Sequence, residues 1–505
     1  MKGILNMKYK LRAAVWEITM ACNMRCKHCG SKCAERLCDE LTTDEAIALC
    51  DELVEMKLDF ITLSGGEPTT RFDWPLIAER LSTGGIKTSL ITNGWLWDED
   101  LIAKTIKAKV HSVAVSIDGL KETHDYIRRE GSFERDMDTI HRLIDAGIHV
   151  AVITTVNKVN LLELDEMFKL FSTLGISVWQ LQIAMPMGNL KEHKDLYLSP
   201  DNVDDIIDFA YNRLGTGVTI ALADCIGYYN SKAMEVVQKH IAEDWCWQGC
   251  GAGKQSIGIL HNGDITACTS LRSSDFIVGN IRERRLSQIW NDPNSFSWNR
   301  EMKKENLVGL CKKCQYGSMC LGGCTNSRLC MNGSIYSDNK FCSYHVAVSE
   351  FESKLDELIA ENTYDNLIEE YINTEQYQLA ELVIAHKLEI HEDINTLELY
   401  AYVNFELENY KVCQQVNEKI LLLDENNSYA LKGMGLSLIK ENCLLMGLEY
   451  LFRALKFNSG KTFDPYYDLC VVLKELDIHL LLEELHNEAK KCPDYQAEQF
   501  QGLLS

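Results

Sequence analysis

The chain has 505 residues, of which 46% are hydrophobic and 25% charged, and a formal net charge of −23. This composition is typical of a folded globular protein and excludes a disordered chain or a chain embedded in a membrane. Because a single hydrophobic core stops growing at roughly 250 to 300 residues, the length predicts several domains.

The beginning of the chain does not have the pattern of a targeting segment. Lys8, Lys10 and Arg12 interrupt its apolar residues, so neither a signal-peptide core nor a span of ~20 apolar residues is present. We therefore expect a cytoplasmic protein that makes no membrane contact. In a reducing cytosol, clustered cysteines are metal ligands more often than disulfides, and this chain has 20 cysteines.

Residues 13–189 alternate short apolar runs with helical patterns. The runs are "AVWEITM", "DFITLSG", "TSLITNG", "HSVAVSIDG", "HVAVITTV" and "VWQLQIAMP". Between them, Leu, Ile and Ala recur at spacings of three and four residues. Thr42 and Glu45 form a capping-box signature at the start of one predicted helix, and Gly147 predicts the end of another. Six βα repeats with parallel strands predict an α/β fold, a partial (β/α)6 TIM-like barrel.

In such a barrel the loops that follow the strands build the site. A cysteine triplet follows the first predicted strand, "SGGEP" follows the second, "TNG" the third and "SIDG" the fourth. We therefore expect these four features to meet on one rim of the sheet.

The cysteine triplet is formed by Cys22, Cys26 and Cys29, with the spacing CxxxCxxC. Three thiolates can hold three irons of a 4Fe-4S cluster and leave the fourth iron open for an outside ligand. The alternatives are an incomplete zinc site, buried thiols and a redox pair. In "SGGEP", Gly65 and Gly66 have no side chains, so a small polar molecule can approach the backbone closely. The missing ligand is therefore expected to be a bound cofactor.

Residues 246–345 are rich in Cys, Gly and Asn and contain few periodic stretches. Cys250 and Cys268 flank "GAGKQSIGILHNGDITA", and "CKKCQYGSMCLGGC" follows about forty residues later. The small core of this part would be weak, and bound metal can supply the missing folding free energy. Zinc ribbons also use CxxC pairs, so a zinc site is an alternative for the second block.

From about residue 350 the pattern is helical throughout. Leu421, Leu455 and Ala489 recur with a period of 34 residues, which suits tetratricopeptide-type (TPR-like) helix pairs, with a plain helical bundle as the alternative. Residues 351–505 contain 12 Lys and Arg against 29 Asp and Glu, a net charge of −17. Because such a surface repels phosphate backbones, we expect no nucleic-acid partner.

The CxxxCxxC motif with an aromatic residue, His28, before its last cysteine resembles that of the radical S-adenosylmethionine (radical SAM) enzymes. The resemblance implies a 4Fe-4S cluster on Cys22, Cys26 and Cys29 that reductively cleaves S-adenosylmethionine to a 5′-deoxyadenosyl radical. It further implies that the cofactor is bound by residues of three loops, namely Gly65, Gly66, Glu67, Ser116 and Arg128. Asn93 of "TNG" is either part of this site or a turn residue.

The downstream cysteines resemble the SPASM extension of these enzymes, which holds two auxiliary 4Fe-4S clusters and brings the expected total to three. The resemblance gives one cluster the ligands Cys311, Cys314, Cys320 and Cys342. It gives the other the ligands Cys250, Cys268 and Cys324. Cys246 is the candidate for the fourth ligand of this second cluster. If it is not a ligand, one iron is left open for a substrate group. Five cysteines match no motif and are expected mostly to be buried thiols: Cys33, Cys38, Cys50, Cys225 and Cys330.

These patterns divide the chain into a radical SAM barrel (1–235), a SPASM iron–sulfur domain (236–348) and an acidic TPR-like domain (349–505). The resemblance implies a maturase that modifies a ribosomally made peptide by a thioether or carbon–carbon crosslink. Thr269 stands where a sulfatase-maturing enzyme would have an acidic residue, which disfavours that activity. Maturation of a small haem-type cofactor and sulfatase maturation are the alternative enzymatic functions, and an iron–sulfur electron-transfer protein is the non-enzymatic alternative.

The expected partners follow from this function. They are a precursor peptide and an electron donor such as flavodoxin or ferredoxin. Helical repeats form concave surfaces that suit extended peptides, so the repeats are expected to hold the leader peptide or a carrier protein.

Overall fold

The computed structural model describes residues 9–223, 225–359, 364–458, 462–500 and 503. The chain forms two compact units. The first contains residues 1–312 and 316–346, and the second contains residues 313–315 and 347–505.

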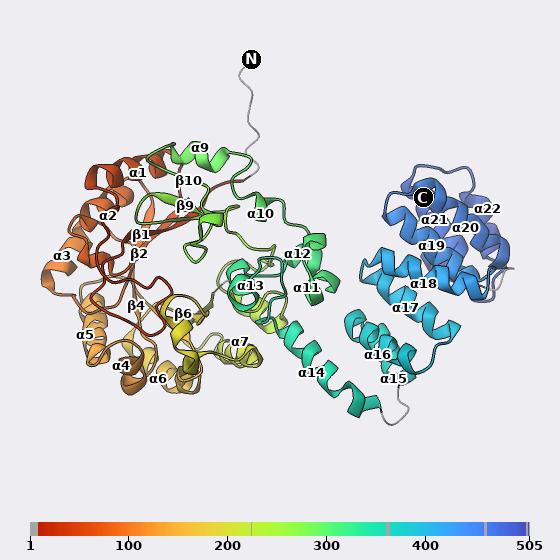
Figure 1. Ribbon diagram of the computed structural model, residues 1–505, viewed down its shortest axis with the longest axis horizontal. Helices are drawn as coiled ribbons and strands as arrows, with labels where there is room; N and C mark the ends of the chain where they lie inside the picture. The colour runs from red at the N-terminus through yellow and green to blue at the C-terminus, as the bar shows by residue number, and fades with distance from the viewer. Residues whose placement is uncertain (1–8, 224, 360–363, 459–461, 501–502, 504–505) are drawn as a thin grey trace, which may run out of the picture. The chain divides into compact units, whose positions relative to one another are not determined.

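The first unit is built on one ten-stranded sheet (Figure 1) with the strand order β10-β9-β8-β1-β2-β3-β4-β5-β6-β7. Neighbouring strands from β1 to β7 are all parallel. Their bounds are β1 (Ala13–Thr19), β2 (Phe60–Gly65), β3 (Lys87–Thr92), β4 (Ser112–Ser116), β5 (Val150–Val156), β6 (Val178–Ile183) and β7 (Thr219–Leu222).

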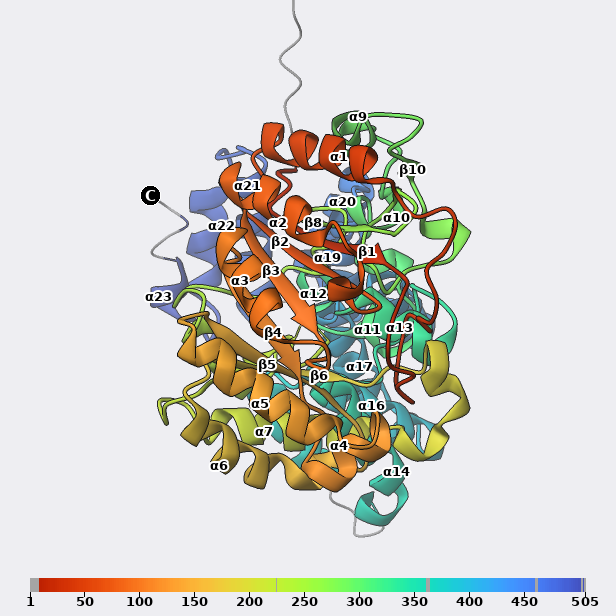
Figure 2. The ribbon, with the colours of Figure 1, turned by 90° about the vertical axis from the view of Figure 1, so that its left-hand side faces the viewer.

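The helices between the strands cover the outer face of this sheet (Figure 2). They are α1 (Thr43–Glu55), α2 (Trp74–Thr83), α3 (Glu99–Lys107), α4 (Lys121–Ile127), α5 (Ser132–Asp145), α6 (Leu164–Leu174), α7 (Val203–Tyr211) and α8 (Ser231–Gln238). Apolar side chains of strands and helices, Trp16, Trp74 and Trp179 among them, share one core. This core fixes the strand ends from which the functional loops emerge.

The predicted α/β fold with a parallel sheet is confirmed. All six expected strands are present, and the chain adds a seventh, β7, which is only four residues long. The capping box at the start of α1 is present, because Thr42 and Glu45 exchange side-chain to backbone hydrogen bonds. Gly147 follows Ala146, the C-cap residue of α5, and has a φ of 75°, as expected for a glycine that terminates a helix.

The cysteine-rich region extends the same sheet. Its strand β8 (Ser256–Ile259) pairs in parallel with β1, and β9 (Asp264–Thr266) and β10 (Gly279–Asn280) continue antiparallel. Short helices follow: α9 (Leu286–Asn291), α10 (Ser297–Arg300), α11 (Gly309–Lys313), α12 (Gly317–Cys320) and α13 (Thr325–Asn332). The region is therefore joined to the parallel strands by backbone pairing as well as by the covalent chain.

The second unit is helical in all its described residues. Helix α14 (Ser343–Ile359) begins in the first unit, and the helices of the second are α15 (Tyr364–Asn373), α16 (Tyr377–Ile390), α17 (Ile394–Glu406), α18 (Tyr410–Leu423), α19 (Ser428–Lys440), α20 (Leu444–Asn458), α21 (Asp464–Glu475), α22 (Leu482–Ala489) and α23 (Ala497–Phe500). Consecutive helices from α15 to α22 pack against one another, around three small apolar clusters.

None of the helices in the described part of the chain combines the length and the apolar character that a membrane crossing requires. The expectation that the chain begins without a signal peptide concerns in part residues 1–8. These residues lie outside the described part of the chain.

Candidate active site on the rim of the sheet

The loop after β1 brings Cys22, Cys26 and Cys29 together. The thiols are electrostatic neighbours, since Cys29 raises the pKa of Cys22, and Cys22 and Cys29 both raise the pKa of Cys26. Backbone and side-chain N–H groups point at the sulfur atoms: the N–H of Met24 lies 3.4 Å from Cys22 Sγ and the amide of Asn93 lies 3.8 Å from it. Such donors stabilise and tune cluster-bound sulfur.

The three thiols have different acidities. Burial raises the pKa of Cys22 and raises the pKa of Cys26 to about 12. A hydrogen bond from the Cys33 thiol lowers the pKa of Cys29 to about 5. A ligand thiol must lose its proton, and the hydrogen bond from Cys33 favours that loss at Cys29.

The donor set fits a 4Fe-4S cluster. Three half-buried cysteines share one loop, and the Arg128 guanidinium lies close enough to lower the pKa of Cys26 and of Cys22. Among the described residues, no three His, Cys, Asp or Glu side chains converge on one metal ion. A cluster does not require such a point, because each cysteine binds a different iron.

The glycines of "SGGEP" lie against the cysteine loop. A Cβ on Gly65 would stand 2.2 Å from the carbonyl oxygen of Thr19, and one on Gly66 would stand 2.1 Å from that of Ala21. The N–H of Gly66 donates to the Thr19 carbonyl and that of Glu67 to the Ala21 carbonyl, each at 2.8 Å. The space that the two glycines leave is therefore used, at least on this side, by the chain's own backbone.

The Glu67 carboxylate connects two loops of the rim. It is 1% exposed, and it accepts hydrogen bonds from the Thr92 hydroxyl (2.9 Å) and the Asn93 N–H (2.8 Å). Thr69 donates to it as well. Burial raises the pKa of Glu67, although these hydrogen bonds lower it in part. The carboxylate thus holds the "TNG" turn against the second loop.

Asp118, in "SIDG" after β4, holds two of the predicted cofactor residues. Its Oδ2 atom lies 2.8 Å from His28 Nε2 and accepts a hydrogen bond from Arg128 Nε at 2.5 Å. Although burial raises the pKa of Asp118, the cations beside it lower that pKa more, and the net shift is far below the ordinary value. The ionised carboxylate therefore fixes both side chains next to the cysteine loop.

The two remaining rim residues are also in place. Ser116, 8% exposed, is the last residue of β4. The Asn93 amide donates to Asn23 Oδ1 at 2.7 Å as well as lying near Cys22 Sγ, so Asn93 links the third loop to the cysteine loop.

Residues outside the sequence motifs complete the support of the cysteine loop. After β6, Asn189 donates its backbone N–H to the Cys29 carbonyl (2.9 Å) and its side-chain amide to the Cys26 carbonyl (3.0 Å). From the cysteine-rich region, Arg272 pairs with Glu17 of β1 and also contacts Ser31.

The auxiliary cysteines fall into two environments. The half-buried Cys324 has the thiols of Cys250 and Cys268 as electrostatic neighbours, and burial raises its pKa well above the ordinary value. The backbone N–H of Cys311 donates a hydrogen bond to Asp338 Oδ1 at 3.0 Å. Burial raises the pKa of Tyr229, and the nearby thiols of Cys246 and Cys320 raise it further. Burial also raises the pKa of Cys342. Cys314 lies in the segment 313–315 of the second unit.

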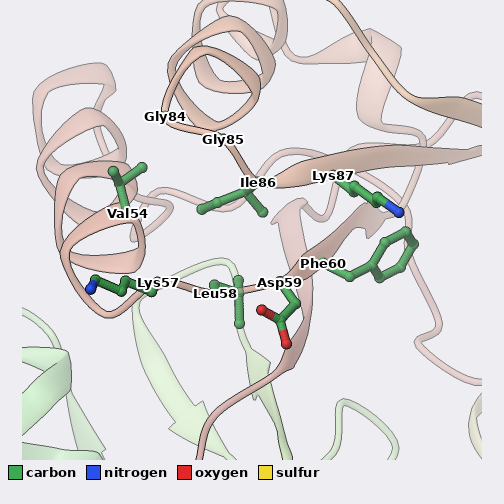
Figure 3. A pocket seen from close by; sticks show the side chains of 9 residues that line it. All are labelled: Val54, Lys57, Leu58, Asp59, Phe60, Gly84, Gly85, Ile86 and Lys87. Carbon is green, nitrogen blue, oxygen red and sulfur yellow. The ribbon is translucent and has the colours of Figure 1, made fainter.

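A pocket of about 700 Å³ lies away from these residues (Figure 3). It is lined by Asp59 and Phe60 at the start of β2, by Ile86 and Lys87 at the start of β3, and by neighbouring residues of the α1 and α2 ends. Because strand starts and strand ends are on opposite edges of a parallel sheet, this pocket is not part of the rim site.

Sequence reasoning missed Asp118, Asn189 and Arg272. Asp118 stood in a motif that had already been singled out, so its position in a rim loop was an available signal. Asn189 and Arg272 act from segments far away in sequence, and no local pattern distinguishes them.

Comparison with protein families gives two matches. The radical SAM superfamily matches residues 16–171, and the iron–sulfur cluster-binding SPASM domain matches residues 250–315. These matches support an enzyme with 4Fe-4S clusters and S-adenosylmethionine as cofactors.

Curated relatives share the same two-domain part. The chain is 31% identical to the AdoMet-dependent heme synthase of Methanosarcina barkeri over 66% of this chain and 96% of that protein. It is 30% identical to the enzyme of the same name from Oleidesulfovibrio alaskensis over 66% and 87%. The mycofactocin maturase MftC of Mycolicibacterium smegmatis is 27% identical over 61% and 76%.

Solved structures show the same fold at low identity. The Streptococcus suis protein SuiB, bound to its precursor peptide SuiA, superposes with a TM-score of 0.56 at 16% identity over 66% of this chain and 76% of that one. The protein anSMEcpe with bound AdoMet gives a TM-score of 0.54 at 18% identity over 69% and 98%.

The expected main function, modification of a ribosomally made peptide, is wrong by these comparisons. Relatives that match at 28–31% identity are named AdoMet-dependent heme synthase or Fe-coproporphyrin III synthase, which favours the alternative of haem-type cofactor maturation. Peptides are bound in two of the solved structures of lower identity, SuiB with its precursor peptide SuiA and anSMEcpe with the Cp18Cys peptide.

Proposed function

Because the chain belongs to the radical SAM superfamily and carries a SPASM iron–sulfur domain, we propose that it is an enzyme that matures a haem-type tetrapyrrole. The observation that carries this proposal is its identity of 30% and 31% to two proteins named heme synthase, whose length it covers to 87% and 96%.

Cys22, Cys26 and Cys29 are the proposed ligands of the catalytic cluster. When bound, the cluster and S-adenosylmethionine supply an organic radical that removes a hydrogen atom from the substrate. Gly65, Gly66 and Glu67 hold the loop on which the cofactor rests. The Glu67 carboxylate fixes this loop, because it accepts hydrogen bonds from Thr69, Thr92 and Asn93.

His28, Ser116 and Arg128 are the remaining proposed cofactor residues. Arg128 keeps its charge in a buried place because Asp118 pairs with it through Nε. Its guanidinium faces Cys26 closely enough to act on that thiol, so it can attract an anionic group beside the cluster. Ser116, at the end of β4, offers a hydroxyl on the same rim.

The substrate class proposed is an iron porphyrin with propionate side chains. Removing one hydrogen atom from a –CH2–CH2–COO⁻ group, and then losing CO2 and one electron, leaves a vinyl group, –CH=CH2. The electron passes to a redox carrier. Carboxylates and vinyl groups are the side chains by which coproporphyrin and haem differ, and both compounds occur in the names of the relatives.

The test is an anaerobic reaction of the reconstituted full-length protein with S-adenosylmethionine, a reductant and iron-coproporphyrin III. We expect 5′-deoxyadenosine and a porphyrin that has lost the elements of formic acid from one or more side chains, both detected by liquid chromatography and mass spectrometry. The matched control, in which Cys22, Cys26 and Cys29 are replaced by Ala, should form neither product.

The outcome against the proposal is an unchanged porphyrin together with 5′-deoxyadenosine formation that the porphyrin does not stimulate. In that case the chain cleaves its cofactor but acts on a different substrate class.

Three clusters are proposed in total. The second uses Cys250, Cys268 and Cys324, and the third uses Cys311, Cys314, Cys320 and Cys342. A flavodoxin or ferredoxin is the proposed electron donor, and the acidic helical unit is proposed to bind a carrier or partner protein.

Two finer features of the fold are also proposed. The parallel sheet is read as a partial TIM-like barrel, because βα units follow one another in strand order. The helical unit is read as TPR-like, because Ile394 and Ser428, which start α17 and α19, lie 34 positions apart, as do Tyr410 and Leu444 of α18 and α20.

A further inference from the structure

The second cluster has a fourth thiol beside it. Three thiols raise the pKa of Cys324 electrostatically. The effect of Cys225 is smaller than that of Cys250 and larger than that of Cys268. Three thiols from three other segments of the first unit, those of Cys225, Cys250 and Cys268, are therefore neighbours of Cys324. Four thiolates are the number that a closed 4Fe-4S cluster takes.

Cys225 is held at this place by the end of the sheet. It lies three residues after β7, and its Sγ atom accepts a hydrogen bond from the N–H of Ile183, the last residue of β6, at 3.5 Å. Its thiol is on the same edge of the sheet as the catalytic loop, since both follow the carboxyl ends of parallel strands.

The next residues join this loop to the loop of Cys324. Tyr228, 4% exposed, accepts hydrogen bonds on its hydroxyl from the Cys324 N–H (3.1 Å) and from the Asn339 amide (2.8 Å). A Cβ on Gly323 would stand 2.5 Å from Cζ of this ring. The hydrogen bond from the Cys324 N–H to the Tyr228 hydroxyl and the close packing of Gly323 on the Tyr228 ring thus hold this loop against the loop of Cys324.

The same loop has a constrained backbone. Gly227 and Tyr228 have φ angles of 99° and 54°, both in the left-handed region, which is costly for tyrosine. A side chain on Gly227 would also collide with Ala233, whose Cβ would be 2.4 Å away. Because of this turn, one short segment supplies both Cys225, a neighbour of the Cys324 thiol, and Tyr228, which accepts from the Cys324 N–H.

Cys246 has a different environment. Its Sγ is contacted by the Gln248 amide at 3.8 Å in an exposed position, and it acts on the Tyr229 hydroxyl, as Cys320 does. The Tyr229 ring stacks on Tyr316, 4.8 Å away. Cys225 is thus an electrostatic neighbour of Cys324, whereas the contacts of Cys246 are with Gln248 and Tyr229.

We propose that Cys225 is the fourth ligand of the auxiliary cluster held by Cys250, Cys268 and Cys324. The inference rests on the part of the proposed function that gives these three cysteines a cluster, and it is independent of the substrate. A cluster with four protein thiolates has no iron left for a substrate group. Its function is then to exchange electrons or to stabilise the fold, and not to bind a substrate sulfur.

The test removes the catalytic cluster, so that only auxiliary clusters remain. In full-length protein with Cys22, Cys26 and Cys29 replaced by Ala, we expect about eight iron atoms per chain after anaerobic reconstitution. Adding Cys225→Ala should lower this by about one iron and produce a 3Fe-type EPR signal, because one corner of the cluster loses its ligand.

Two marker variants in the same background assign the signal. Cys250→Ala should remove the EPR signal of the reduced cluster that Cys225→Ala alters, and Cys342→Ala should remove the other one. Cys246→Ala, the matched control, should leave iron content and both signals unchanged.

A conservative variant covers the case in which Cys225→Ala does not accumulate. Cys225→Ser should keep four irons in the cluster and shift its midpoint potential, since an oxygen ligand replaces sulfur. Unaltered iron content, spectra and potential in the Cys225 variants would overturn the proposal, as would loss of the same cluster in Cys246→Ala. None of these readouts uses porphyrin turnover, so the failure of the proposed substrate would not affect them.

Discussion

Asp136 has a buried carboxyl group, and burial disfavours its charged form. Burial raises its pKa to about 9, and its Oδ2 atom lies 3.1 Å from His124 Nε2 without hydrogen-bond geometry. Burial also lowers the pKa of His124 to about 3, so His124 offers no positive charge near neutral pH. Asp136 is therefore protonated in the folded protein under ordinary conditions.

This residue predicts a pH dependence of stability. The pKa of Asp136 is raised from about 3.9 in the unfolded chain, so its contribution is complete below pH ~4 and is lost as pH rises towards about 9. In that window the free energy of unfolding should fall by up to roughly 1.4 kcal/mol per pH unit from this group. Asp136→Asn should lose less stability than the wild type between pH 6 and pH 9, measured by urea unfolding.

The exposed Asp145 at the end of α5 provides the control. Asp145→Asn should follow the pH profile of the wild type. Parallel profiles for Asp136→Asn and the wild type would contradict the prediction, because they would show that Asp136 is ionised in the folded protein.

At the scale of elements, the rim depends on how closely two loops approach. A methyl group on Gly66 would meet the Ala21 carbonyl oxygen at 2.1 Å and the Cys22 Cβ at 3.0 Å. Gly66→Ala should therefore displace the cysteine loop and cost the protein about four iron atoms, together with cleavage of S-adenosylmethionine. Iron analysis and 5′-deoxyadenosine formation without substrate measure both effects.

Gly85→Ala is the matched control for this substitution. Gly85 has a φ of 92° and open space around its missing Cβ, so alanine strains the backbone without touching the cysteine loop. It should lower stability and leave the iron content unchanged. Equal iron loss in both variants would mean that Gly66 acts through general destabilisation.

The strands and their loops were largely predictable, because periodicity and capping are local. Six strands, the Thr42 capping box and the Gly147 terminator are where the sequence places them. β7 was missed because its four residues, "TIAL", are too short for a pattern. The pairing of β8 with β1, the Asn189 clamp and the Cys225 position were beyond local reasoning, because each depends on contacts between distant segments.

At the scale of the whole molecule, the two units have separate cores. The main cluster of the first unit uses residues up to Val346, and the clusters of the second use residues from Phe351 onward. A chain that ends at Ser349 should therefore fold its parallel sheet and keep cofactor cleavage at the full-length level. 5′-deoxyadenosine formation and circular dichroism compare the two proteins, and a truncated protein unable to cleave the cofactor would show that the units are not independent.

The pairing of β8 with β1 also has a consequence for biosynthesis. On one side β1 pairs with β2, which begins within fifty residues of it. At its other edge β1 pairs with β8, which lies about 240 residues later in the chain. At ribosomal rates of roughly 5 to 20 residues per second, that edge stays open for about 12 to 50 s. An open edge of apolar strand is a template for pairing with other nascent chains. Strand β1 is thus vulnerable to aggregation until the cysteine-rich region has been translated.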